Sequence, residues 1–310
     1  MHYRQFKDRM VQGFVSLICF FVVSLLFVMV FGLYERAKPI LSVVGLKELL
    51  FSFDWRPMQG KFGLASFIMG TFWVTVIAMV IAVPLSVLTA VFLSEYCPRK
   101  IRGWLKPVID LLAGISPVIY GVWGVIVIVP LVRDTLMPFL SERLPFFPFA
   151  SDNATGFSAL TAGIVLAVMV APLMISVIEE VIQTVSAEMR EASAALGATR
   201  WQTTKWVVLK KARPGIIAAV ILGLSRAMGE TMAVLMVAGC AMQVFPKSIF
   251  DAAYPLPALI ANTYGEMMSV PLYDSAILLS ALILLLVTVL FNMSAWGILL
   301  SIEAREARGE

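Results

Sequence analysis

Uncharged apolar runs long enough to cross a lipid bilayer dominate this sequence, and the first of them extends from Phe14 to Leu33. At about 1.5 Å per residue, roughly 20 helical residues cross a hydrocarbon core of about 30 Å. A polar segment precedes this run, and the segment LYERAKP at its end lacks the small-x-small pattern of a cleaved signal peptide. We therefore interpret the run as a retained membrane-spanning helix.

Five further apolar runs follow the first, and the composition agrees with them. Hydrophobic residues make up 60% of the chain and charged residues 14%, whereas soluble domains have roughly 45–50% and about 25%. No internal repeat or low-complexity segment divides the chain. The sequence predicts an all-α, polytopic membrane protein with a single transmembrane domain over residues 1–310. Its six predicted spans are residues 14–33, 67–93, 108–131, 158–178, 215–240 and 274–300.

The distribution of basic residues predicts the orientation of these spans. Six spans place both termini on one side, and that side carries fifteen of the 24 Lys and Arg residues, against eight on the other side. Cytoplasmic loops are enriched in Lys and Arg. We therefore expect a multi-pass protein of the plasma (inner) membrane, with both termini in the cytoplasm and residues 179–214 as its largest cytoplasmic loop.

Several classes of function are excluded by residues that the sequence lacks. Cys19, Cys97 and Cys240 form an odd set without C-x-x-C spacing, which indicates neither a disulfide framework nor a metal site. The only histidine is His2, so metalloprotease and Ser–His–Asp chemistry in the membrane are excluded. No G-x-x-x-x-G-K-[ST] loop for nucleotide is present. We expect no catalytic residue, no bound metal and no nucleic-acid partner.

The loop 179–214 has the pattern of two short helices. Ser186 can cap the first helix, and Glu188 and Glu191 suit its opening turns because acidic residues are favoured at the positive end of the helix dipole. Gly197 stands where a helix commonly ends in a left-handed residue. These features alone leave two interpretations equally open, a helix that docks a partner and a plain surface loop.

The same loop resembles the E-A-A-x3-G-x9-I-x-L-P signature of ABC importer permeases. Ser193 stands for alanine and Val207 for isoleucine, which keeps size and shape, while Lys210 stands for proline and leaves the junction with the fifth span in doubt. The resemblance implies a type I ABC importer permease whose loop docks a separate ATPase subunit and passes on its motion. The residues implied in this coupling loop are Glu191, Ala192, Ser193, Gly197, Val207 and Leu209.

The fifth span contains a charged pair, Arg226 and Glu230. Arg226 lies roughly 16 Å into the span, near the middle of the bilayer. An arginine there costs about 2.5–3.5 kcal/mol on insertion scales, so it usually faces the bundle interior or a water-filled path. We expect Glu230, at i+4 on the same helix face, to neutralise it, while Gly223 and Gly229 let a helix or ligand approach. The pair is interpreted either as an anion site in a substrate pathway or as a permanent brace between helices.

Four segments extend the resemblance to the phosphate-specific permeases of the PstC type: FLSEYCPRKIRGWLKP, YGVWG, SRAMGETMAVLMVAG and LPALIANTYGEM. The resemblance implies inward transport of inorganic phosphate with a second permease subunit of the PstA type, two ATPase subunits and an extracytoplasmic phosphate-binding protein. It also implies that ATP and Mg²⁺ bind to the ATPase partner and that this chain binds no cofactor. An Arg-x3-Glu pair also occurs in permeases that resemble the molybdate and sulfate importers, so these oxyanions are the alternative substrates.

Overall fold

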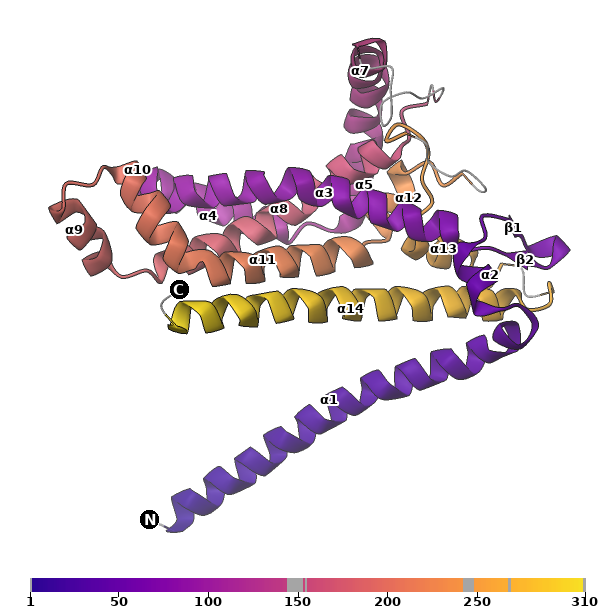
Figure 1. Ribbon diagram of the computed structural model, residues 1–310, viewed down its shortest axis with the longest axis horizontal. Helices are drawn as coiled ribbons and strands as arrows, with labels where there is room; N and C mark the ends of the chain where they lie inside the picture. The colour runs from indigo at the N-terminus through magenta and orange to yellow at the C-terminus, as the bar shows by residue number, and fades with distance from the viewer. Residues whose placement is uncertain (1, 144–152, 154, 242–247, 267–268, 309–310) are drawn as a thin grey trace.

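A computed structural model describes residues 2–143, 153, 155–241, 248–266 and 269–308 of the chain. Over these residues the structure is helical apart from one two-stranded hairpin and an isolated bridge. The long helices α3 (Ala65–Val91), α8 (Ala159–Gln183), α11 (Leu209–Gly229) and α14 (Tyr273–Arg308) lie side by side, with the short helices α9 (Ala187–Ala195) and α10 (Arg200–Thr203) at one end and the hairpin at the other (Figure 1).

Groups of shorter helices separate the long ones along the chain, and the hairpin lies near its start. The first half of the chain forms α1 His2–Val43, α2 Leu46–Phe51, β1 Trp55–Arg56, β2 Lys61–Phe62, α3 Ala65–Val91, α4 Arg99–Ala113, α5 Pro117–Trp123, α6 Val129–Leu131 and α7 Met137–Arg143. The second half forms α8 Ala159–Gln183, α9 Ala187–Ala195, α10 Arg200–Thr203, α11 Leu209–Gly229, α12 Met232–Val237, α13 Leu256–Thr263 and α14 Tyr273–Arg308. The wider π-type turns Phe92–Tyr96, Gly124–Ile128, Val132–Leu136 and Thr204–Val208 continue these helices.

Helical stretches of membrane-spanning length confirm a polytopic membrane protein. Among the described residues, five of them are long and apolar enough to span, namely Met10–Val43, Ala65–Tyr96, Pro117–Leu140, Ala159–Gln183 and Tyr273–Gly297. The first, second, fourth and sixth predicted spans overlap four of these. The third and fifth predicted spans differ from the structure in ways that matter for the site.

The predicted third span, 108–131, is wrong as one helix. Helix α4 ends at Ala113, Ser116 is extended with a ψ of 137°, and α5 begins at Pro117. A proline disfavours the helical conformation of the residue before it, which explains the break. The spanning helix therefore starts at Pro117, and through the π-type turns it continues past residue 131, where the predicted span ends. Helix α4 is a separate amphipathic helix.

The predicted fifth span, 215–240, is also wrong as one helix. Helix α11 ends at Gly229, Glu230 is extended with a ψ of 125°, and α12 starts again at Met232. Helix α11 lies beside α8 and α14 (Figure 1). It is not among the five apolar stretches of the described chain. The fifth membrane segment is therefore an interrupted helix whose break falls next to Arg226.

Helices α3 and α8 form the centre of the bundle. A Cβ atom at Gly163 of α8 would collide with the Ile77 side chain of α3, so a glycine lets the two backbones approach closely. Further along, the Ser86 hydroxyl of α3 donates to the Ala171 carbonyl of α8 at 3.3 Å. Close packing of this kind fixes the relative positions of the ends of the two helices, where buried charged residues lie.

Helix α1 joins the bundle only through its C-terminal part. Ala37 and Ile40 are fully buried in an apolar cluster with Trp55 of the hairpin and Tyr273 at the start of α14. The earlier part of α1 projects away from the other helices (Figure 1), and its apolar side chains, such as Phe20, are exposed. In a bilayer these side chains contact lipid or a neighbouring subunit.

Candidate functional site

Helix α9 and its C-terminal turn are built as the sequence predicts at Gly197. Its φ is +83°, which a residue without a Cβ adopts most easily. The Gly197 N–H donates to Ala194 O at 2.9 Å and the Ala198 N–H donates to Ser193 O at 3.2 Å, the two bonds of a Schellman motif. Leu196, at this turn, is 90% exposed. The turn therefore presents an apolar tip to its surroundings. Ser186 holds the N-cap position of α9, but its hydroxyl makes no cap hydrogen bond.

The second helix of this segment begins with a complete capping box. The Thr199 hydroxyl accepts from the Gln202 N–H at 3.3 Å, and the Gln202 side chain accepts from the Thr199 N–H at 2.8 Å. The Ser193 and Thr203 hydroxyls lie 2.9 Å apart and join α9 to α10. The second predicted helix is present as α10, but it does not end within the loop, because a π-type turn carries it directly into α11. Residues 200–229 therefore form one continuous helix.

Arg190 of α9 links three helices. Its guanidinium donates to Glu95 Oε1 at 2.8 Å and 3.2 Å, at the end of α3. It also donates to the main-chain carbonyls that end α8, with Ile182 O at 3.0 Å, Ser186 O at 3.4 Å, and Val185 O in a further contact. A cation is favoured beside such carbonyls because they carry the negative end of the helix dipole.

Glu179 is the charged residue that sequence reasoning missed. Its side chain is 1% exposed in α8, where it accepts from Arg102, from Lys106 Nζ at 2.9 Å and from Gln183. The hydrogen bond to Glu179 raises the pKa of Lys106. The sequence did contain a signal for it, because Glu179 directly follows an apolar run. A carboxylate that is buried at such a position requires a partner. This cluster fixes the polar face of α4 to the end of α8.

Arg226 and Glu230 do not form the predicted pair. Because α11 ends at Gly229, the two side chains no longer share a helix face. Glu230 Oε1 instead accepts from the Met232 N–H at 3.1 Å and from the Ala233 N–H at 3.4 Å, so it caps α12. Arg226 is half-buried, and the described part of the chain gives it neither an ion pair nor a hydrogen bond. Within the described residues the guanidinium is therefore left without an acidic partner.

Two interrupted helices meet beside Arg226. Gly121 of α5 packs directly on Ala233 and Met236 of α12. The Tyr120 hydroxyl reaches back across the break between α4 and α5 and donates to Leu112 O at 2.8 Å, and Tyr120 lies within electrostatic reach of Arg226. Interrupted helices at membrane depth are tolerated where they are buried in protein or line a cavity. The breaks in the third and fifth membrane segments therefore lie in packed parts of the bundle that contact each other through α5 and α12.

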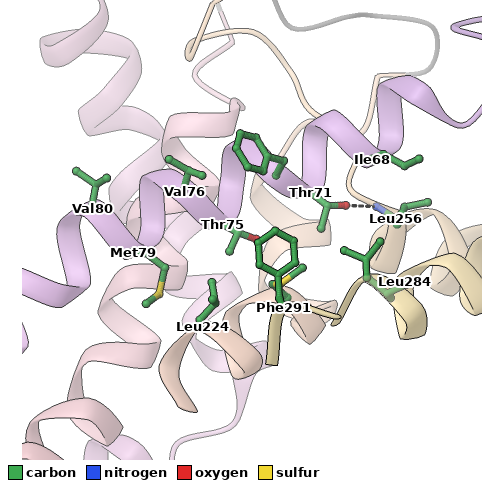
Figure 2. Close-up of a pocket in the computed structure, with 13 residues that line it drawn as sticks. Ile68, Thr71, Thr75, Val76, Met79, Val80, Leu224, Leu256, Leu284 and Phe291 are labelled. Atoms are coloured by element: carbon green, nitrogen blue, oxygen red, sulfur yellow. Dashed lines mark hydrogen bonds between the residues drawn. The ribbon is translucent and has the colours of Figure 1, made fainter. Parts of the chain in front are cut away.

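An apolar pocket of about 270 Å³ lies between α3, α11, α13 and α14. Figure 2 shows Leu224, Leu284 and Phe291 directed toward the side chains of α3. Thr71, the polar residue nearest α13, uses its hydroxyl to accept from the Leu256 N–H at 2.8 Å. None of the described residues that line the pocket is charged, so it offers no counter-charge for an oxyanion. The pocket is therefore not the anion site.

Comparison with known sequences agrees with the membrane architecture and the loop signature. Residues 82–305 match the family of binding-protein-dependent transport system inner membrane components. The chain is 36% identical over 285 residues to the probable phosphate transport system permease protein PstC of Methanocaldococcus jannaschii, with 90% of each chain covered. It is 38% identical over 263 residues to the phosphate transport system permease protein PstC of Xylella fastidiosa (strain Temecula1), covering 84% of this chain and 80% of that one.

Solved structures of transporters share the fold. A chain of the bacterial alginate ABC transporter, in complex with alginate pentasaccharide-bound periplasmic protein, matches with a TM-score of 0.63 at 15% identity, and 93% of each chain is covered. A chain of the MetNI methionine ABC transporter in an inward facing conformation matches with a TM-score of 0.52 at 20% identity, covering 77% of this chain and 94% of that one. The family match over residues 82–305 and the identity to PstC permeases over most of the chain show that the chain belongs to the binding-protein-dependent transport system inner membrane components, and within them to the PstC-type permeases.

Proposed function

We propose that this chain is the transmembrane subunit of an ABC importer that moves inorganic phosphate into the cytoplasm. The observation that carries this proposal is the identity to PstC permeases along nearly the whole chain, together with an uncompensated arginine at a helix break. The chain is a permease component and not itself an enzyme, because it belongs to a family of transport subunits.

Arg226 is the proposed contact for the oxyanion. A guanidinium presents a planar fork of donors that matches phosphate oxygens. Because Arg226 has no acidic partner among the described residues, an incoming anion does not have to displace one. Glu230 contributes indirectly in this proposal, since by capping α12 it fixes the break beside the arginine.

Residues 187–209, which form α9, its turn, α10 and the π-type turn up to the start of α11, are the proposed docking and coupling segment for the ATPase. Leu196 is an exposed tip of the kind that a partner groove covers, and the continuous helix from α10 leads from this tip to Arg226. The coupling residues proposed within it are Glu191, Ala192, Ser193, Gly197, Val207 and Leu209.

The chain assembles with other subunits of an ABC transporter, as its family implies. We propose a second permease subunit of the PstA type, two ATPase subunits that bind ATP and Mg²⁺, and a phosphate-binding protein on the outer face. The first residues of α1, the last residues of α14, and α9 all lie toward the same end of the molecule (Figure 1). This supports the proposed orientation with both termini in the cytoplasm.

Uptake of labelled phosphate by the reconstituted complex tests the proposal. Arg226→Ala should lower uptake at least tenfold, because losing one charge-assisted hydrogen bond costs about 1.5–3 kcal/mol and 1.4 kcal/mol is a factor of ten. Arg226→Lys should also impair uptake, since an ammonium group lacks the bidentate fork. Arg99→Ala is the control, because Arg99 is exposed at the start of α4.

Competing anions decide the substrate. An excess of unlabelled phosphate should abolish labelled uptake, whereas molybdate and sulfate at the same concentration should leave it largely unchanged. Competition by molybdate or sulfate as strong as that by phosphate would assign the other oxyanions. Normal uptake by Arg226→Ala would remove Arg226 from the pathway.

A further inference from the structure

The end of α3 is held from two sides by arginines of the α9–α10 segment. Arg190 binds the Glu95 carboxylate. Arg200, ten positions later, donates to the main-chain carbonyl of Glu95, and its guanidinium lies 4.9 Å from the centre of the Tyr96 ring. Both the side chain and the backbone of this last turn of α3 are therefore bound to the segment that the proposed function assigns to the ATPase.

The Arg190–Glu95 pair differs from an ordinary surface ion pair in its burial. The Glu95 side chain is 9% exposed and the Arg190 side chain is 27% exposed. Exposed pairs contribute little because water and salt screen them, whereas loss of one partner of a largely buried pair leaves an uncompensated charge. The contact thus resists separation when α9 is displaced.

The turn that receives these contacts is wider than an ordinary helical turn. Residues Phe92–Tyr96 form a π-type turn, which the Cys97 N–H closes by donating to Phe92 O at 2.8 Å. Turns of this kind mark places where a helix departs from regular geometry, frequently at functional sites. Helix α3 leads from this turn to the packed interface with α8 at the centre of the bundle.

We infer that Arg190 and Glu95 are positioning residues for transport, forming the joint through which displacement of α9 is delivered to α3 and α8. The inference rests on the proposed docking of the ATPase at α9. Arg190 suits this role because its one guanidinium holds both helices: it binds the carboxylate at the end of α3 and the terminal carbonyls of α8. Neither residue touches substrate in this role.

Transport and ATP hydrolysis measured together in the reconstituted complex test the joint. Arg190→Gln and Glu95→Gln should keep the ATPase subunit bound and hydrolysing ATP, but should lower phosphate uptake per ATP at least tenfold. The double reversal Arg190→Glu with Glu95→Arg should recover a substantial part of that loss, because it restores the ion pair. Glu180→Gln is the matched control, since Glu180 also pairs with a basic residue, Lys106 at 3.5 Å, but its side chain is 67% exposed.

A native thiol gives a second readout that does not depend on the substrate. Cys97 follows the turn directly, and it becomes the only thiol when Cys19 and Cys240 are replaced by alanine. Addition of ATP to the complex should change the rate at which a maleimide labels Cys97 if α3 moves with α9. Arg190→Gln should abolish that change while leaving the labelling rate without nucleotide unaltered.

The two readouts separate the possible failures. If the wild-type complex takes up no phosphate but ATP still alters Cys97 labelling in an Arg190-dependent way, the substrate proposal fails and the joint stands. If uptake per ATP and the nucleotide-dependent labelling both survive Arg190→Gln and Glu95→Gln, the joint is refuted. Loss of the bound ATPase in both variants without recovery by the double reversal would also refute it, since the pair would then only maintain the fold of α9.

Discussion

Removing charges from the cluster around Glu179 should have strongly unequal effects on stability, depending on which partner is lost. The Glu179 side chain is 1% exposed, whereas the side chains of Arg102 and Lys106 are 27% and 32% exposed. If Glu179 is removed, the Arg102 and Lys106 side chains can turn toward water, but the buried Glu179 carboxylate cannot do so if its cations are removed. We therefore expect Glu179→Gln to be the mild change, and the double variant Arg102→Gln with Lys106→Gln to be the severe one.

The contacts give approximate magnitudes for the two changes. The double variant leaves a buried carboxylate with Gln183 as its remaining described donor, and breaking a buried pair in this way costs about 3–5 kcal/mol. Glu179→Gln removes the charge but keeps an oxygen acceptor, and the partly exposed cations recover hydration, so its cost should be about 1–2 kcal/mol. The triple variant, which neutralises all three groups, should be more stable than the double variant.

Thermal denaturation of the purified permease in detergent, followed by loss of the monodisperse size-exclusion peak, measures this order. In chains of 150–250 residues 1 kcal/mol shifts Tm by about 2–4 °C. Taking about 2 °C for this longer chain, we expect a fall of about 8 °C for the double variant and about 2–4 °C for Glu179→Gln. A Glu179→Gln variant as unstable as the double variant would refute the reasoning, as would a triple variant no more stable than the double.

Three further expectations rest on backbone and packing features. Gly197→Val should weaken binding of the ATPase subunit in a pull-down, because a Cβ at a φ of +83° costs about 1–2 kcal/mol. Gly197→Asn should weaken binding less, and equal losses of binding in the two variants would contradict the role of the left-handed turn. Glu230→Ala should lower stability by about 1 kcal/mol, because α12 loses its cap. Glu230→Gln should lower it less, since glutamine keeps an oxygen acceptor. An unchanged Tm for Glu230→Ala would argue against the cap. Gly223→Ala should lower the free energy of unfolding by about 1–3 kcal/mol, because its Cβ would lie 2.5 Å from Met174 Sδ. Gly229→Ala is the control, since Gly229 has open space around it and the change should not destabilise the protein. Equal Tm values for the two variants would contradict the packing.

Hydropathy located most of the membrane helices because lipid exposure demands long uncharged runs. It could not place the breaks in the third and fifth spans, since both breaks lie inside apolar sequence. The segment 114–117 did contain a local signal, Gly-Ile-Ser-Pro, because a residue before proline is disfavoured in a helix. At Glu230 the signal was ambiguous, because a glutamate four residues after an arginine is equally consistent with a continuous helix.

The conformation of the coupling segment was easier to predict than the buried charge cluster around Glu179. Gly197 was confirmed in a left-handed conformation, since a helix C-terminus depends on local sequence. The basic partners of Glu179, Lys106 and Arg102, lie 73 and 77 positions away in the chain. Periodicity within one helix gives no information about such pairings. Only the packing of α4 and α8 brings these charges together.

Arg226 also has a consequence for how the protein is made. Helix α11 is absent from the stretches of the described chain that are apolar enough to span, and its basic residues lower its preference for lipid. The small-residue contact of Gly223 with α8 offers a protein surface in place of lipid. We therefore expect α11 to enter the bilayer by packing against α3 and α8, which precede it, and not as an independent hydrophobic segment. The arginine that we propose for substrate contact would then also set the order of membrane insertion.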